Sequence, residues 1–142
     1  MGYCIDQIGS KFTILSENFD RALSAIKALM KNENEMSGGS WSGGKQTERW
    51  FAWVNTSTVL EATTLADALA EWGWEPEQNE DGIYDIIFRG EKLGDDDKLF
   101  RTLAPFVKCG SYICIRGEDG ALWQYYFEGG RMKEKNGRVV WE

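Results

Sequence analysis

The C-terminal half of the chain is divided into short apolar segments by tight-turn signatures. These signatures are Asp81-Gly82, Glu118-Asp119-Gly120, Gly129-Gly130 and Asn136-Gly137. Each contains glycine or asparagine, the residues that adopt a positive φ with least strain, as tight hairpin turns require. The spacing therefore predicts hairpins and a C-terminal β-meander. The expected strands are Ile83–Phe88, Ser111–Arg116, Ala121–Glu128, Gly130–Lys133 and Arg138–Trp141.

Three segments have the apolar spacing of amphipathic helices, with apolar residues three or four positions apart. The first follows Ser16, the expected N-cap. The second covers about Leu65–Trp72 and ends at Gly73, a residue suited to a left-handed stop. The third is capped by one of Asp95–Asp97 and ends at Pro105.

Strand formers are concentrated in Tyr3–Ile8, Lys11–Leu15 and Arg49–Val54. The last of these carries aromatic residues at both alternating positions, so we expect it to be covered on both faces. No long linker divides the chain. The sequence predicts a single α+β domain over residues 1–142, with about three helices packed on a mainly antiparallel sheet.

Residues 32–47 differ in composition, because glycine and serine dominate and only Met36 and Trp41 are large and apolar. Such a segment gains too little burial to offset the entropy of ordering, so we expect a flexible Gly/Ser-rich loop at 32–47. A phosphate-binding loop is the alternative. Gly43-Gly44-Lys45 lacks the spacing and the Lys-Ser/Thr ending that such a loop needs.

Histidine is absent from the 142 residues. No side chain therefore has an ordinary pKa between 5 and 8, which excludes histidine-based acid–base catalysis, histidine triads and histidine zinc sites. Cys109 lacks a histidine base, and Ser40 or Ser42 has only Lys45 as a partner. The sequence predicts no catalytic residue, no cofactor and no metal site, and the balance is against an enzyme.

The net charge of −7 is concentrated in the middle of the chain, where residues 71–119 carry twelve acidic and six basic side chains. A negative field repels phosphate backbones, so direct nucleic acid binding is not expected, whereas a basic protein partner is favoured. No apolar run reaches the roughly 20 residues that span a bilayer, so no membrane association is expected.

The three cysteines, Cys4, Cys109 and Cys114, form neither an even-numbered disulfide framework nor a CxxC motif. No signal peptide is visible at the N-terminus. We therefore expect reduced thiols in a cytoplasmic protein, with Cys114 acting as a small buried apolar residue.

Acidic clusters offer two further candidate sites. Gly94–Asp97 has oxygen ligands suited to Mg²⁺ or Ca²⁺, but it lacks the alternating ligands of a calcium loop, and helix capping accounts for acids at a helix start. Glu118-Asp119-Gly120 is interpreted as a hairpin turn rather than a ligand group.

The seven tryptophans fall into two groups. The periodic positions of Trp50, Trp53, Trp72 and Trp123 indicate core packing. The other three are Trp41 in the expected loop, Trp74 after a helix stop and Trp141 in the last expected strand, so we expect them at a contact surface. In Leu122–Phe127, alternation places Tyr126 opposite the core face, as a half-exposed contact residue.

Four phrases in the C-terminal half resemble a group of small uncharacterised bacterial and prophage proteins that share them in the same order. The phrases, followed by Trp123, are GEKLGDD (90–96), LAPFV (103–107), GSYI (110–113) and GEDG (117–120). The resemblance implies a bacterial or mobile-element setting. No activity is established for the group, so the resemblance implies no catalytic residues.

Together these features predict a small acidic protein-interaction module, carried by a phage or mobile element, that binds a basic surface of a host protein as an inhibitor, immunity or anti-defence protein does. The alternative is a small-ligand-binding protein or a carboxylate-dependent enzyme, with two or three of Asp85, Glu91, Glu118 and Glu128 converging in an aromatic pocket beside Trp123. The candidate protein-binding residues are Trp41, Trp74, Trp141, Tyr126, Asp95, Asp96, Glu118 and Asp119.

Overall fold

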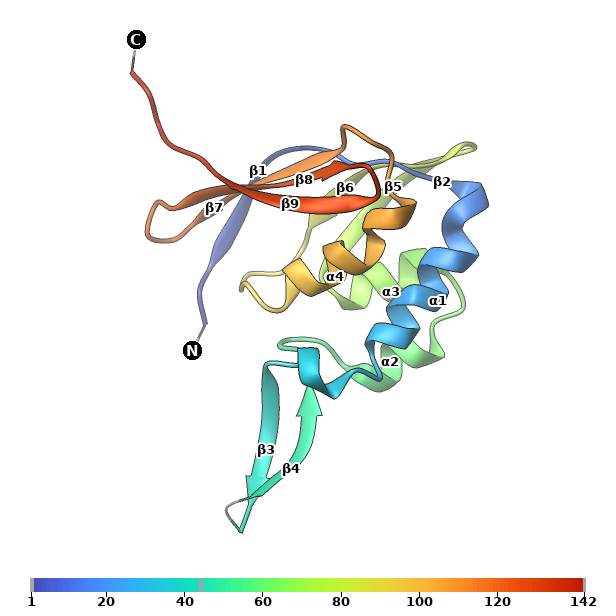
Figure 1. Cartoon of the computed structure of the whole chain (residues 1–142), viewed down its shortest axis with the longest axis vertical. Helices are drawn as coiled ribbons and strands as arrows, with labels where there is room; N and C mark the ends of the chain where they lie inside the picture. The colour runs from blue at the N-terminus through green and yellow to red at the C-terminus, as the bar shows by residue number, and fades with distance from the viewer. Residues whose placement is uncertain (1, 44, 142) are drawn as a thin grey trace.

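Four α-helices and nine strands make up the part of the chain that the computed structural model describes, residues 2–43 and 45–141, with the side chains of residues 41, 42 and 45–48 left aside. The helices are α1 (Phe19–Leu29), α2 (Thr56–Glu61), α3 (Leu65–Glu71) and α4 (Asp96–Leu103). The strands are β1 (Ile5–Lys11), β2 (Ile14–Leu15), β3 (Gly38–Ser42), β4 (Lys45–Trp50), β5 (Trp74–Asn79), β6 (Gly82–Phe88), β7 (Tyr112–Gly117), β8 (Leu122–Glu128) and β9 (Arg131–Asn136). They form antiparallel sheets of four, three and two strands (Figure 1). The expected α+β class is confirmed.

The four-stranded sheet has the order β1-β7-β8-β9 and contains the predicted C-terminal meander. Its inner face is apolar, because Ile113 and Ile115 of β7 and Tyr125 and Phe127 of β8 are all buried. Phe100 of α4 packs against Tyr125, with ring centroids 5.5 Å apart. The alternation expected along β8 is therefore confirmed, and α4 covers the inner face of this sheet.

The segment Arg138–Trp141, predicted as a further strand, is not a strand. β9 ends at Asn136, and the last backbone hydrogen bond runs from the Gly137 N–H to the Leu122 carbonyl at the start of β8. Beyond that point β8 offers no more backbone to pair with. The chain continues away from the sheet, as the red end in Figure 1 shows.

The three-stranded sheet, β2-β6-β5, is joined to β1 by a side chain rather than by a backbone ladder. Gln7 of β1 donates through Nε2 to the carbonyl of Ile86, and its Oε1 accepts from the N–H of Phe88, both at 2.7 Å. A β-bulge between Gln7 and Gly9 interrupts the register of β1 with β7. The amide of Gln7 therefore connects the two larger sheets.

The helices agree with the predictions in position but not in every cap. Thr64 caps α3 by accepting from the N–H of Asp67, and Gly73 follows the helix with φ of +90°. Ser16 caps no helix; it begins a 3-10 turn, and α1 starts at Phe19. The helix α2, with Asn55 as its cap, was not predicted, because its polar sequence has no clear apolar stripe. No helix in residues 2–43 and 45–141 is long and apolar enough to cross a membrane.

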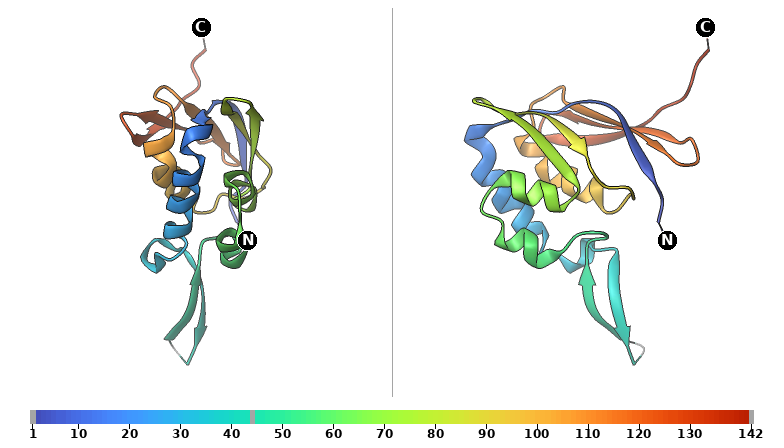
Figure 2. Two further views of the ribbon diagram at one scale, coloured as in Figure 1. Left: turned by 90° about the vertical axis from the view of Figure 1, so that its right-hand side faces the viewer. Right: turned by 180° about the vertical axis from the view of Figure 1, so that it is seen from behind.

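The segment expected to be a loop at 32–47 contains a 3-10 turn at Glu33–Glu35 and the first strand of a hairpin. Strands β3 and β4 pair from Gly38↔Trp50 to Ser42↔Lys45, and the hairpin projects from the body of the molecule (Figure 2). The expected loop is wrong in this respect, because cross-strand pairing supplies the backbone partners that composition does not reveal. The flexibility of the hairpin stays a prediction.

An aromatic cluster forms the centre of the core. Phe12, Phe100, Tyr125 and Phe127 are buried, and Trp74 is 0% exposed. The rings of Trp74 and Phe100 meet edge to face with centroids 5.1 Å apart, a favoured aromatic arrangement. The expected place of Trp74 at a contact surface is therefore wrong: β5 begins at this residue and directs its side chain into the core.

Candidate functional site

Residues 51–54 form a turn at the base of the hairpin, where a strand was expected. Phe51 and Val54 are buried, while Trp53 is 59% exposed and has φ of +67°. Among the described non-glycine residues, Trp53 alone has a positive φ. This left-handed backbone conformation costs a residue that has a side chain about 1–2 kcal/mol of stability. The predictions of a strand through residue 54 and of a core position for Trp53 are both wrong.

The carboxylate of Asp95 holds this turn in place. Its Oδ2 accepts from the N–H of Ala52 at 2.9 Å and from Ser37, through the hydroxyl at 2.9 Å and the N–H at 3.3 Å. Ser37 precedes β3 and Ala52 follows β4, so one carboxylate connects both ends of the hairpin to the start of α4. Asp95 occupies the N-cap position of α4, as expected, but its side chain makes no capping hydrogen bond.

Asp96, the neighbour of Asp95, is also buried. Its Oδ1 accepts from the indole N–H of Trp74 and its Oδ2 from the N–H of Gly94, both at 2.9 Å. Burial raises the pKa of this carboxyl above its ordinary value, and these hydrogen bonds oppose the shift. Asp95 and Asp96 therefore connect elements inside the molecule, and the expectation that they lie at a contact surface is wrong.

The indole of Trp53 lies over glycine on its inner side and faces solvent on the other. Its Nε1 donates to the carbonyl of Leu93 at 3.3 Å. A Cβ on Gly2 or Gly94 would come within 3.1 Å of the ring, a tighter contact than most side chains make. A Cβ on Gly94 would also lie 2.6 Å from the carbonyl oxygen of Ala52. The ring is therefore fixed in position although most of it is exposed.

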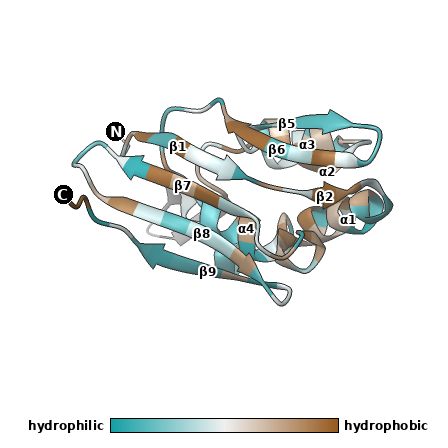
Figure 3. Ribbon diagram, turned by 90° about the horizontal axis from the view of Figure 1, so that it is seen from above, coloured by the Kyte–Doolittle hydropathy of each residue, from teal (hydrophilic) through white to brown (hydrophobic). Residues whose placement is uncertain are grey.

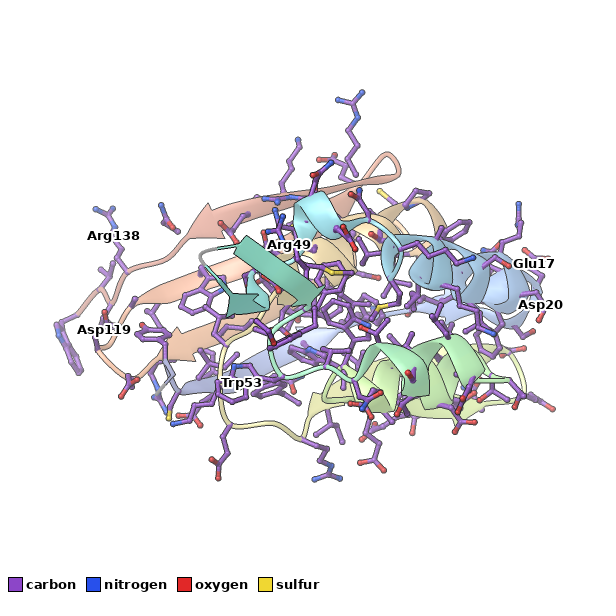
Figure 4. The ribbon with its side chains drawn as sticks, turned by 90° about the horizontal axis from the view of Figure 1, so that it is seen from below. Glu17, Asp20, Arg49, Trp53, Asp119 and Arg138 are labelled. Atoms are coloured by element: carbon purple, nitrogen blue, oxygen red, sulfur yellow. The ribbon has the colours of Figure 1, made fainter. Side chains whose placement is uncertain are left out.

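Two open hollows adjoin Trp53. The first, of about 730 Å³, lies at the base of the hairpin and is lined by Arg49, Trp50, Trp53, Asn55 and Glu71 among others. Figure 4 shows Arg49 and Trp53 on either side of the hairpin in the view from below. The second, of about 300 Å³, is more apolar and is lined by Trp53, Trp72, Gly73, Phe88, Gly90, Glu71, Glu91 and Lys92. We call these two hollows and the ring between them the Trp53 surface.

Polar groups of both signs line the Trp53 surface. Glu71 accepts from the N–H of Asn55 at 3.2 Å, and Glu91 contributes a second carboxylate. Lys92 donates to the sulfur of Cys4 at 3.3 Å, and this hydrogen bond raises the pKa of the lysine. Arg49 donates through Nη2 to the Met36 carbonyl at 2.6 Å. Such a surface can hold an apolar side chain against rings and pair a cation with carboxylates.

Two buried donors at the Trp53 surface have no acceptor among the described residues. They are Nε of Arg49 and Nε1 of Trp72. A buried polar group without a partner costs about 1–3 kcal/mol. The fold therefore retains two uncompensated donors in residues that line these hollows.

The other predicted contact residues lie apart from the Trp53 surface. Trp141 is 92% exposed in the C-terminal segment. Tyr126 is half-buried on β8, with the ammonium of Lys135 4.0 Å from its ring centroid. The side chain of Trp41 lies outside the described residues, although its backbone pairs with Gln46 in the hairpin.

The acids of the Gly117–Gly120 turn bind the N-terminal segment. Glu118 accepts from the N–H of Cys4 at 2.9 Å, and Asp119 accepts from the hydroxyl of Tyr3. That hydroxyl lowers the pKa of Asp119, with help from the N–H of Ala121. Both acids are exposed. As predicted, they belong to a hairpin turn, and their carboxylates also tie down the start of β1.

The carboxylates expected to converge beside Trp123 have separate partners. Asp85 accepts from Ser10, whereas Glu128 pairs with Lys133 at 3.4 Å on the far strand. Trp123 itself stacks on Tyr3, with centroids 6.4 Å apart. In the described ranges, no group of three or more His, Cys, Asp or Glu residues is placed to hold a metal ion.

The thiols are free, and their burial differs from the expectation for one of them. Cys109 is exposed, whereas Cys4 and Cys114 are half-buried. Cys114 was expected in the core. It lies on the outer face of β7 instead, because Ile113 and Ile115 on either side of it occupy the inner face.

Sequence reasoning did not identify Trp53, although one signal was present. The run Arg49–Val54 has too many aromatic residues for one strand with a solvent face, so one ring had to be exposed or the strand had to end. Comparison of the chain with protein-family models, with curated proteins and with solved structures found no match, so the candidate site depends on its own geometry.

Proposed function

We propose that the protein is a small, non-enzymatic interaction module that binds a basic protein surface through the Trp53 surface. The observation that carries the proposal is the conformation of Trp53. A large ring is 59% exposed at a backbone position where glycine would be less strained, and Asp95, Leu93 and two glycines fix it there. Strain kept at an exposed aromatic residue is typical of functional sites.

The chemistry of the surrounding groups supports a basic partner. Glu71 and Glu91 lie beside the ring, and the segment that contains them carries most of the acidic excess of the chain. A partner that inserts an apolar side chain beside Trp53 and Phe88, with lysine or arginine at the rim, would satisfy both features. We place this module in a bacterial cytoplasm, where the free thiols would stay reduced, and assign it the inhibitor or anti-defence role expected from the sequence.

The proposal is tested by capture of partners from a bacterial lysate on immobilised protein, followed by identification of the bound proteins. We expect a basic partner to bind the wild type and to be lost with Trp53→Ala, because truncation of a central aromatic residue typically weakens an interface by about 2 kcal/mol or more. Glu91→Lys should weaken the same partner and reduce the salt dependence of its association rate.

Tyr84→Ala is the matched control, because Tyr84 is an aromatic residue of β6 with similar exposure outside the Trp53 surface. The Tyr84→Ala variant should capture the same proteins as the wild type. A partner that binds Trp53→Ala as strongly as the wild type would rule out the Trp53 surface as the contact, provided that the variant unfolds at the wild-type temperature.

A further inference from the structure

A second surface lies on the other side of the molecule, on the outer face of the four-stranded sheet. Seen from above, β1, β7, β8 and β9 lie in front of α4, and no described helix covers this face (Figure 3). Pairing places Lys11, Tyr112, Tyr126 and Lys133 in one row across the four strands. The next row contains Cys114, Gln124 and Lys135. Two tyrosines therefore lie side by side on the central strands, with lysines on both edges.

The charge of this face is opposite to that of the whole chain. The alternation of the strands places five cations and two carboxylates on it, in an otherwise acidic molecule. The carboxylates of Asp6 and Glu128 pair with Arg116 and Lys133 at 3.5 and 3.4 Å. The remaining cations, Lys11, Arg131 and Lys135, are exposed and form no ion pair within the described residues. An anionic partner fits this face.

The tyrosine pair identifies the class of anion. Lys135 lies 4.0 Å from the ring centroid of Tyr126, a contact worth about 0.5–1 kcal/mol at an exposed site. A stacked base contributes about 1–3 kcal/mol. A base can therefore replace the ammonium on the ring, and the displaced lysine becomes free to contact a phosphate. Acidic protein side chains would use the lysines but gain little from the rings.

We propose that the outer face of the β1-β7-β8-β9 sheet binds single-stranded nucleic acid, with bases stacked on Tyr112 and Tyr126 and phosphates held by Lys11, Arg131 and Lys135. Aromatic residues on the central strands of a four-stranded sheet are a known arrangement for stacking unpaired bases. The net charge of the chain disfavours nucleic acid, but the fold separates the charges, so this face does not repel a phosphate backbone. This site is distinct from the Trp53 surface.

The test is fluorescence anisotropy of the full chain with a labelled oligothymidine 12-mer and an oligouridine 12-mer at low salt. We expect binding, and the logarithm of the association constant should fall with the logarithm of the salt concentration with a slope of about −2, as three phosphate contacts give. Tyr126→Leu should weaken binding at least fivefold, whereas Tyr126→Phe, which keeps the ring, should stay within about twofold. Lys135→Glu should weaken binding and reduce the slope by about 1.

Two control variants test whether the oligonucleotide binds at this face. Tyr84→Leu removes an exposed tyrosine of β6 and should change nothing, and Trp53→Ala should leave oligonucleotide binding intact. A folded wild-type protein that binds neither oligonucleotide would overturn the proposal. Equal affinity of Tyr126→Leu and Tyr126→Phe, or equally tight binding of a 12-base-pair duplex, would also overturn it. Displacement of the oligonucleotide by polyglutamate with no effect of the tyrosine variants would assign the face to acidic proteins instead.

Discussion

At the scale of single residues, two buried carboxylates contact the segments that carry Trp53 and Trp74. Asp95 accepts hydrogen bonds from Ser37 and Ala52, and this contact makes Trp53 turn outward. Asp96 accepts from the indole of Trp74 and so provides the acceptor that the N–H of this buried ring needs. Relative to the sequence prediction the places of these two tryptophans are reversed, because Trp53 is exposed and Trp74 is buried.

The strain at Trp53 leads to a prediction about stability. Trp53→Gly removes about 1–2 kcal/mol of backbone strain. It also removes the packing of the partly covered ring and increases the entropy of the unfolded chain, which costs about 0.5–1 kcal/mol of stability. The free energy of unfolding should therefore stay within about 1 kcal/mol of the wild type. Urea denaturation measures this change. A loss above about 3 kcal/mol would show that the fold itself requires the ring and would weaken the case for a functional site.

Asp95 should matter far more to stability than its neighbour Asp97. Asp95→Ala leaves the N–H groups of Ser37 and Ala52 without their acceptor, which should cost about 2–4 kcal/mol. Asp97→Ala removes only a partly exposed pair with Arg101, worth about 0.5 kcal/mol. Thermal unfolding of the two variants compares them directly. Equal effects would contradict the role assigned to Asp95.

At the scale of elements, Asp96 of α4 makes a pH-dependent contribution to the free energy of unfolding. Burial raises its folded-state pKa, so the folded protein holds this proton more tightly than the unfolded chain. The contribution of Asp96 is therefore fully present below the ordinary aspartate pKa and is lost as pH rises through the raised value. Asp96→Asn should remove this fall from the stability profile. Urea denaturation from pH 4 to pH 7 measures both proteins, and parallel profiles would be inconsistent with this role.

The elements that sequence reasoning predicted correctly are those with local causes. Turns at Gly120 and Gly129-Gly130 and the Gly73 stop each depend on a few adjacent residues. The hairpin and the turn at Trp53 depend on Asp95, which lies 43 positions along the chain from Ala52. No spacing in the sequence encodes such a contact. The surplus of aromatic residues in Arg49–Val54 signals an exposed ring, but the geometry of the Trp53 surface depends on this distant contact.

At the scale of the whole molecule, the fold separates functions that composition averages together. Most of the acidic excess lies in residues 71–119, which include Glu71 and Glu91 of the Trp53 surface, whereas the outer face of the large sheet collects cations. The two proposed surfaces therefore attract partners of opposite charge from different sides of the chain. Their tests are independent, because no residue belongs to both.

The junction made by Gln7 has a mechanical consequence. A backbone ladder transmits load through many hydrogen bonds in parallel, whereas the seam between β1 and β6 depends on side chains, the amide of Gln7 and the hydrogen bond from Ser10 to Asp85. The curved wall formed by the two larger sheets therefore has a line of weakness along β1. Opening along that line would leave the ladders of both sheets intact, while the contacts of Trp74 with Asp96 and Phe100 would still hold β5 to α4.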